Sequence, residues 1–393
     1  MWLAYALALC NLTAVKSNMM LTSLYAVELG VDPITTGTLF SIYAVAPILL
    51  GVYAGRVVDS AGMRLPMLAG SAGMVIALVL PYFFPGVPTL FCSASLLGAA
   101  YVFYHVGIHN MVGALSTEET RTRNFANYSL ATTVPYFIGP LFTGLLIQHG
   151  GYALAYVLLA ALPMLAGVLL MNAGYVIPER RHAGSAKAPA RPLRDLLRNH
   201  RLVRMATVSG LALTSVDLFL FYAPIQARDA GLTPATIGVV LSLYAVAAVV
   251  VRLFLTQLSR LCGNEERLLI FALAAGTLAY LGFGLFTSPW MLAAMAALLG
   301  AGLGCAQPLS MILTYSYAPE GHTAEGLGLR LTVNNGAHLA LPFGFGLLSS
   351  TVGLLMVFWT NAGILAGCAA VIAGSLRTRQ QPDTSEDAPR AAG

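Results

Sequence analysis

Apolar residues occur along this chain in long unbroken segments that are separated by short polar stretches. Twelve segments are long enough, at about 18–25 residues, to cross a bilayer as helices. They cover residues 3–27, 35–55, 66–84, 89–113, 125–148, 152–174, 202–226, 235–257, 268–286, 290–316, 327–348 and 354–376. The pattern therefore predicts an all-α membrane protein with twelve transmembrane helices.

The two halves of the chain are related by an internal repeat. Residues Gly30–Gly62 align with Gly231–Gly263 at an offset of 201, and ten of these 33 pairs are identical. Chance would give roughly three in so apolar a composition. We predict two pseudo-symmetric six-helix bundles, at 1–174 and 202–376, with a cytoplasmic linker at 175–201 and a disordered cytoplasmic tail at 377–393. Parallel repeats of this kind build a binding site between the halves of many secondary transporters.

Composition and charge agree with a membrane protein. Hydrophobic residues make up 58% and charged residues 9%, whereas a soluble domain carries roughly 25% charged residues. The net charge of +5 does not indicate a nucleic-acid partner, because the cations gather in the linker and in alternate loops. The positive-inside rule then places both termini and the linker in the cytoplasm. We expect a monomer in the lipid bilayer of a bacterial inner membrane.

Cofactor chemistry finds little support in the sequence. The five cysteines show no paired spacing typical of a metal site, so we expect no metal and no disulfide. No phosphate-binding loop ending in Lys-Ser/Thr is present, which disfavours a pump driven by ATP. We therefore expect no cofactor.

The loop after the second segment contains Gly55, Asp59, Gly62 and Arg64. Gly55 allows neighbouring helices to approach closely, and Gly62 allows a tight turn. Asp59 can accept hydrogen bonds or face a helix N-terminus, while Arg64 can pair with an acid or a lipid phosphate. A solvated turn with an isolated carboxylate is the simpler interpretation of the same residues.

This loop resembles the cytoplasmic signature between helices 2 and 3 of the Major Facilitator Superfamily, and helix count, repeat and linker extend the resemblance over the whole chain. It implies two bundles that rock about a central site lined mainly by helices 1, 4, 7 and 10. It also implies that the loop clamps the halves together in the outward-facing state. The second copy departs, since Arg260 replaces the aspartate, so such a gate belongs to the first half. Glu325 and Arg330 could complete it.

The fifth segment contains Gly139, Pro140 and Gly144, which partly match a Gly-Pro signature in helix 5 of exporters of this superfamily. Proline bends a helix and glycine permits close packing, so a simple packing kink is an equally good interpretation. The fourth segment lacks the embedded arginine of proton-linked drug exporters, whose place falls near Ala94. That departure disfavours drug export.

Ionisable residues inside the spans are stronger candidates for function, because each costs roughly 3 kcal/mol or more at the bilayer centre. Lys16 lies near the middle of the first segment, and the repeat aligns it with Asp217 of the seventh. We predict that the two lie close together and face the cavity. They could form a structural lock, or a pair that opens when substrate or a proton replaces one partner. Asn18 adds polarity to the first segment.

Histidines form a second group of candidates. His105 and His109 of the fourth segment share one helix face and are followed by Asn110. They could carry protons, bind substrate or hold the helix in place, whereas a metal site lacks a third ligand. Gln307 occupies roughly the place of the first histidine in the second repeat, and His338 makes the eleventh segment polar. For Arg252, near the end of the eighth segment, snorkelling to the interface is the default.

These observations predict a secondary transporter that moves a small organic solute by alternating access. Coupling to protons is favoured over another ion because histidine, aspartate and lysine are available to titrate. Export is slightly favoured by the Gly-Pro motif, and uptake of a small organic anion that binds Lys16 is the alternative. An intramembrane enzyme that uses His105 and His109 is a remote alternative, because a two-fold repeat serves alternating access and chemistry seldom needs one. We therefore expect no enzymatic activity.

Overall fold

The computed structural model describes residues 1–117, 119–120, 124, 127–128, 131–172, 198–317 and 323–380, and these form helices without strands. The first half contains α1 (Trp2–Glu28), α2 (Pro33–Ala61), α3 (Arg64–Phe83), α4 (Val87–Ala114) and α6 (Val134–Asn172). The second contains α8 (His200–Asp229), α9 (Pro234–Leu253), α10 (Leu255–Cys262), α11 (Glu265–Leu285), α12 (Pro289–Tyr317), α13 (Thr323–Val352) and α14 (Leu354–Gln380). Most of the predicted linker, 175–197, and the tail from 381 lie outside the described residues.

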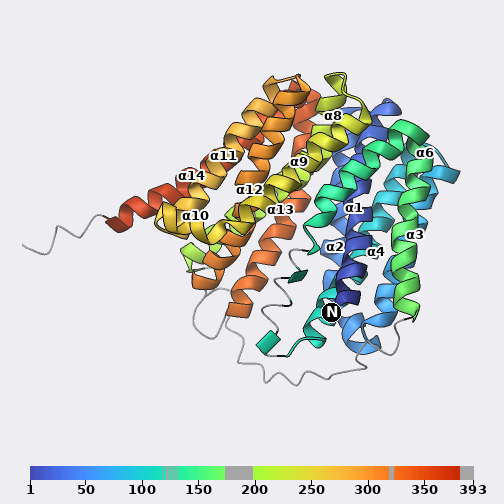
Figure 1. Cartoon of the computed structure of the whole chain (residues 1–393), viewed down its shortest axis with the longest axis horizontal. Helices are drawn as coiled ribbons and strands as arrows, with labels where there is room; N and C mark the ends of the chain where they lie inside the picture. The colour runs from blue at the N-terminus through green and yellow to red at the C-terminus, as the bar shows by residue number, and fades with distance from the viewer. Residues whose placement is uncertain are drawn as a thin grey trace, which may run out of the picture.

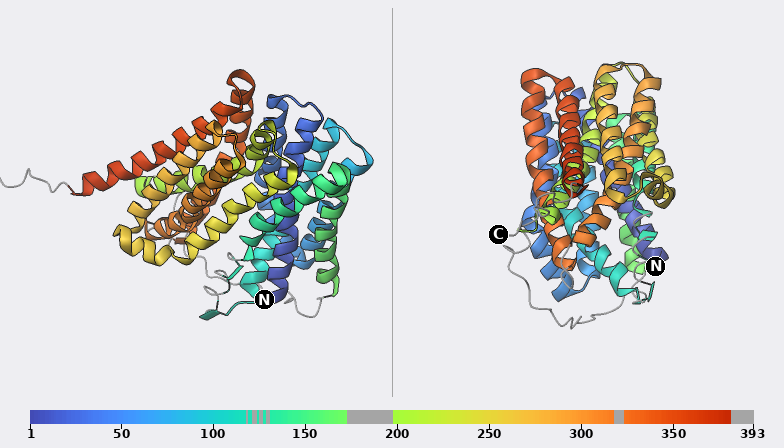
Figure 2. Two further views of the ribbon diagram at one scale, coloured as in Figure 1. Left: turned by 45° about the horizontal axis from the view of Figure 1, so that its top comes forward. Right: turned by 90° about the vertical axis from the view of Figure 1, so that its left-hand side faces the viewer.

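The helices of the two halves form two bundles that lie side by side (Figure 1). The bundles meet where α2 packs on α13, α6 packs on α9 and α1 packs on α8. The left view of Figure 2 shows the bundles inclined to each other. The predicted domain limits stay predictions, although α14 continues to Gln380, past the expected end of the last span.

Equivalent glycines end equivalent helices in the two halves. Gly30 and Gly231 follow α1 and α8 with φ of 68° and 81°. Gly62 and Gly263 follow α2 and α10 with φ of 80° and 87°. Positive φ is easily adopted by glycine alone, so the repeat preserves the residues that the turns require. The tight turn predicted at Gly62 is confirmed.

Two of the expected spans are interrupted in the structure. The break between the fifth and sixth spans lies where the sequence predicts it, because two helices meet at a kink within α6, at the non-helical backbone of Gly151 (φ 72°, ψ 178°). The fifth span is interrupted by a turn at residues 132–133, after which α6 begins at Val134. The eighth span breaks at Phe254, between α9 and α10. Hydropathy does not reveal the breaks before Val134 and at Phe254, because the residues on both sides of each break are largely apolar.

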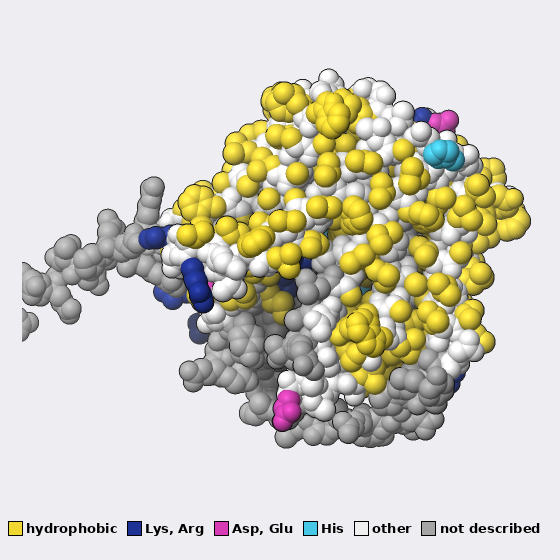
Figure 3. Space-filling view, viewed as in Figure 1, with side chains coloured by type: hydrophobic (Ala, Val, Ile, Leu, Met, Phe, Trp, Pro, Cys, Tyr) yellow, Lys and Arg dark blue, Asp and Glu magenta, His cyan; other side chains and the backbone are white. Residues whose placement is uncertain are grey.

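The outer surface of the molecule suits a lipid environment. Nine of the described helices are long and apolar enough to cross a membrane, and α6 counts once although it contains two spans. α1 and α13 are not among them, and α1 carries polar residues such as Asn11 and Lys16, which it buries. On the face shown in Figure 3, hydrophobic side chains are spread over the upper and right-hand parts of the described surface, where few charged side chains are seen. The protein is therefore a multi-pass membrane protein.

Candidate functional site

A buried ion pair joins the two bundles near the middle of the molecule. Lys16 Nζ of α1 lies 2.8 Å from Asp217 Oδ1 of α8, and the two side chains are 8% and 15% exposed. His338 of α13 brings its Nδ1 to 3.5 Å from the second carboxylate oxygen. The repeat alignment predicts the first contact, and the structure adds His338 to it. The roles of these residues in transport stay predictions.

The surroundings of the ion pair strengthen it. Lys16 Nζ lies 4.6 Å from the centroid of the Tyr136 ring, which is a cation–π distance. Water is largely excluded here, so the Coulomb attraction is screened less than at a surface. Removing either partner would leave the other charge buried and unpaired, which is strongly unfavourable.

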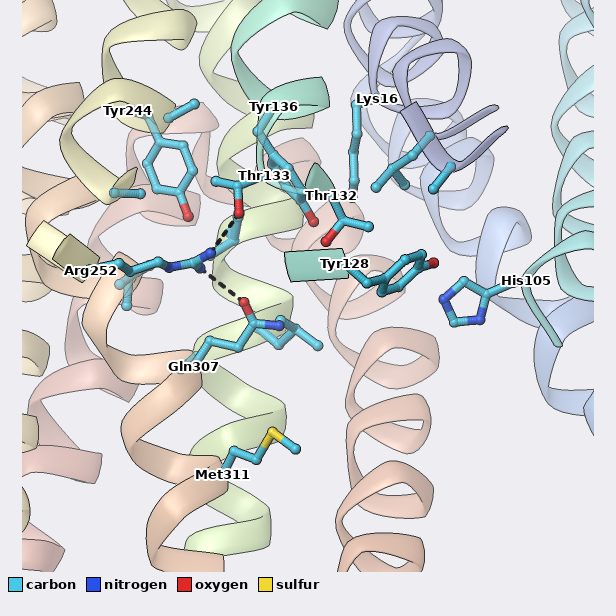
Figure 4. Close-up of a pocket in the computed structure, with 18 of the residues that line it drawn as sticks. Lys16, His105, Tyr128, Thr132, Thr133, Tyr136, Tyr244, Arg252, Gln307 and Met311 are labelled. Carbon is cyan, nitrogen blue, oxygen red and sulfur yellow. Dashed lines mark hydrogen bonds between the residues drawn. The ribbon is translucent and has the colours of Figure 1, made fainter. Parts of the chain in front are cut away.

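A cavity of about 600 Å³ lies between the bundles on the side of the ion pair nearer the N-terminus of α1. Its walls come from α1, α4, α8, α9 and α12 and from Tyr128, Thr132, Thr133 and Tyr136. Polar lining side chains include Lys16, Tyr101, His105, His109, Tyr128, Tyr136, Tyr244, Arg252 and Gln307. Figure 4 shows Arg252 and Gln307 on one side of this space and Lys16 and His105 on the other. The space is large enough for a small organic molecule.

A second, smaller cavity of about 200 Å³ lies beside the ion pair. Asp217 and His338 line it together with Lys16, which lines both cavities. Aromatic side chains, Phe40 and Tyr43 of α2, form part of its wall. The ion pair thus stands between two spaces, so a solute in either could reach it.

The predicted histidines of α4 face the larger cavity. The rings of His105 and His109 have centroids 4.3 Å apart, and His109 also contacts the Tyr128 ring at 5.1 Å. His109 Nδ1 lies 2.9 Å from the carbonyl oxygen of His105, so the ring donates there when Nδ1 carries the proton. Within the described part of the chain, no group of three metal-ligating side chains includes them. Asn110 is exposed and is not among the lining residues.

Asn18 lies apart from the larger cavity. It is fully buried, and its amide donates to the Tyr43 hydroxyl at 2.6 Å and accepts from Thr22 at 3.3 Å. Tyr43 lines the smaller cavity. Asn18 therefore positions a cavity residue within the first bundle and does not line either described cavity itself.

Arg252 of α9 is the residue that the sequence interpretation missed. Its Nε donates to the Gly304 carbonyl at 2.8 Å, its Nη1 to the Thr133 hydroxyl at 2.9 Å and its Nη2 to Gln307 Oε1 at 3.0 Å. The side chain thus points into the cavity and bridges the bundles instead of snorkelling (Figure 4). The signal was present, because an arginine inside a predicted span marks a functional position by default.

The molecule is closed at the end opposite the larger cavity. Arg228 of α8 forms an ion pair with Glu28 of α1 and donates to the Leu24 carbonyl at 2.9 Å and to the Tyr152 hydroxyl at 3.1 Å. Backbones also meet directly between the halves at this end. A Cβ added to Gly37 of α2 would lie 2.2 Å from the Cα of Gly346 in α13.

The Gly-Pro motif of the fifth span lies in the same interface. A Cβ on Gly238 of α9 would lie 2.5 Å from the Pro140 carbonyl oxygen, and one on Gly144 would collide equally with the start of α9. Gly139 packs within the first bundle, where its carbonyl accepts from Ser17 at 3.1 Å. These contacts favour close packing between the bundles as the role of the motif.

Two predicted gate residues whose surroundings the structure describes, Gly55 and Arg64, make no close contact between the halves. A Cβ on Gly55 would meet nothing within 4 Å, so the close helix approach expected there is not made in this conformation. Arg64 donates to the Met171 carbonyl at 2.7 Å, within its own bundle. Arg330 is buried in α13. The side chains of Asp59 and Glu325 lie outside what the structure describes.

Fold and site together define a membrane transporter with a solute cavity between two related bundles. The sequence profile of the Major Facilitator Superfamily matches residues 1–227 and again residues 205–393. The chain therefore belongs to this family. It is a secondary transporter for a small molecule and not an enzyme.

Relatives of known name cover nearly the whole chain. Multidrug resistance protein MdtG of Salmonella dublin is 24% identical over 388 residues, 94% of each chain. The protein of the same name from Escherichia fergusonii is 23% identical over 390 residues, 95% of this chain and 94% of its own. A crystal structure of the nucleoside transporter NupG matches with a TM-score of 0.76 at 14% identity, covering 97% and 99% of the two chains. The peptide transporter POT in complex with sulfate matches at 0.77 and 14%, covering 96% and 94%. At these identities, the solved structures show the fold alone.

Proposed function

We propose that this chain exports a small organic solute across a bacterial inner membrane by alternating access, in exchange for protons. The placement of cations in alternate loops supports cytoplasmic termini. With that orientation the larger cavity, which Ala8, Leu12 and Lys16 line from the N-terminal half of α1, opens toward the cytoplasm. An inward-open cavity is the state that receives a solute for export. The names of the MdtG relatives as multidrug resistance proteins support the same direction.

The observation that carries the proposal is the ion pair of Lys16 and Asp217 between the bundles. A proton on the Asp217 carboxylate would remove the attraction that holds α1 to α8. Lys16 would then lose its counter-ion at the border of both cavities, where a solute could contact it. Binding of a proton and binding of a solute therefore act on the same contact, which is the requirement for coupling.

Purified full-length protein in liposomes tests the coupling. A pH-sensitive dye inside the vesicles would report proton movement when a panel of organic solutes is added. We expect at least one solute to drive proton flux and Asp217→Asn to abolish that flux. Glu265→Gln, at the exposed first residue of α11, should leave it unchanged. Solute movement of equal rate with and without a pH gradient would contradict proton coupling.

Direction is tested in cells. A bacterial host that expresses the chain should accumulate less of the transported solute than a host that expresses Asp217→Asn. Higher accumulation with the functional chain would establish uptake, which is the alternative that the cations of the cavity, Lys16 and Arg252, favour.

A further inference from the structure

The charges on the wall of the larger cavity are unbalanced. The described lining contains two cationic side chains, Lys16 and Arg252, and no aspartate or glutamate. Lys16 is neutralised by Asp217 at 2.8 Å. Arg252 contacts oxygen atoms of a carbonyl, a hydroxyl and an amide, all of which are neutral. The wall therefore presents a net positive charge at Arg252.

The position of Arg252 is fixed without using all of its donors. A guanidinium has five N–H groups in a rigid plane and stays protonated in proteins. Three hydrogen bonds to Gly304, Thr133 and Gln307 hold it, which leaves two N–H groups for a further acceptor. Thr133 belongs to the first bundle and Gln307 to the second, so both halves orient the same cation. A positioned arginine with remaining donors is well suited to a carboxylate or a similar oxyanion.

The wall beside Arg252 is largely apolar. Tyr244 and Ala248 of its own helix line the cavity, and Leu213 and Val216 of α8 and Leu303 of α12 extend the same surface. Such a surface favours burial of an apolar body by roughly 25 cal/mol per Å² of area removed from water. An amine would gain the same burial but would face an uncompensated like charge.

We propose that the transported solute is an amphipathic organic acid whose anionic group binds Arg252 and whose apolar body lies against Tyr244 and α8. This inference rests on the proposed function and names the class of its substrate. Arg252 is then the residue that sets specificity for charge, whereas Lys16 and Asp217 serve coupling.

Binding of three matched probes to the purified full-length protein tests the proposal. Naphthylacetate, naphthylacetamide and naphthylmethylamine share one ring system and carry a negative, neutral or positive group. We expect the acid to bind roughly 10- to 150-fold more tightly than the amide, which is the range for a charge-assisted hydrogen bond. The amine should bind most weakly. An equal or stronger affinity for the amine would overturn the proposal.

Substitutions assign the preference to one residue. Arg252→Gln should remove the preference for acid over amide while leaving amide binding unchanged, which also shows that the variant is folded. Arg252→Lys should retain part of the preference, and Arg260→Gln, at an exposed position on α10, should retain all of it. An acid preference that survives Arg252→Gln would overturn the assignment.

Flux in liposomes separates this proposal from the proposed function. If proton-coupled flux occurs with the amine and not with the acid, the proposed substrate class is wrong, whereas the proposed transport function is supported. If the acid binds through Arg252 but no solute on the panel moves protons, proton-coupled transport is contradicted, whereas the proposed binding site is supported.

Discussion

The two ends of the molecule close and open by different physical means. At the closed end the bundles meet backbone to backbone, at Gly37 and Gly346 and at Gly238 and Pro140. At the open end the bundles are joined across the cavity by a long polar side chain, Arg252. Two backbones can meet only where side chains are absent. A contact across a cavity instead requires a side chain long enough to reach the opposite bundle. The difference shows that close backbone contact seals one end, whereas side chains that span a cavity join the bundles at the other.

The largest effect is expected at the border between the two ends. Asp217→Ala and Lys16→Ala should each abolish transport and destabilise the protein by about 3–5 kcal/mol, because either strands a buried charge. Flux in liposomes and thermal unfolding in detergent measure the two effects. The double variant Lys16→Asp with Asp217→Lys should recover stability if the pair is mainly structural, and flux as well if neither residue contacts solute. Normal flux in either single variant would remove the pair from the mechanism.

The next effect is expected at the closed end. Gly346→Val places a side chain where an added Cβ already lies 2.6 Å from the Gly37 Cα, so the bundles must separate there. We expect flux to fall roughly tenfold or more, as for other overpacked contacts worth 1–3 kcal/mol. Spin labels on the two bundles should report a longer distance at this end. Gly367→Val is the control, since an added Cβ there meets nothing within 4 Å, and its equal loss of flux would contradict the assignment.

A smaller effect is expected at the open end. Asp59→Asn should keep the fold and impair transport several-fold, because the family resemblance places this carboxylate in the clamp that closes this end in the outward-facing state. The same spin-label distances should show the closed form of this end populated less. Neutralising Glu265 at the start of α11, which the repeat aligns with Arg64, by Glu265→Gln should change nothing. Wild-type flux in Asp59→Asn at matched expression would exclude it from the mechanism.

The smallest effect is expected for the ion pair at the closed end. Arg228 and Glu28 are 31% and 49% exposed, and exposed pairs contribute about 0–1 kcal/mol. Glu28→Gln should therefore change flux by no more than about fivefold, and the change should shrink at high salt. Arg228→Gln should have a larger effect, because it also removes hydrogen bonds to Leu24 and Tyr152. Equal effects would assign both variants to the ion pair alone.

The features of the structure that depend on composition and on the internal repeat could be predicted from the sequence. Twelve apolar segments and an offset of 201 were enough to predict the two bundles and to bring Lys16 to Asp217. The breaks at Phe254 and before Val134 were missed, since a local change of backbone direction leaves hydropathy unchanged. The sequence predicts Arg252 at the membrane surface, because it shows how far along the helix the residue lies but not which face of the helix the residue occupies. Which face points inward depends on contacts with Thr133 and Gln307, which lie far away in the sequence.

The buried ion pair also has a consequence for biogenesis. Lys16 and Asp217 are separated by 201 residues, and a ribosome adds roughly 5–20 residues per second. The first helix therefore waits roughly 10–40 s in the membrane before its counter-ion has been synthesised. Over that interval the nascent chain holds a charge whose cost in the bilayer is roughly 3 kcal/mol. During this period the unpaired Lys16 marks a first bundle whose partner has not yet been synthesised. Chaperones and membrane proteases could recognise an incomplete chain by that charge.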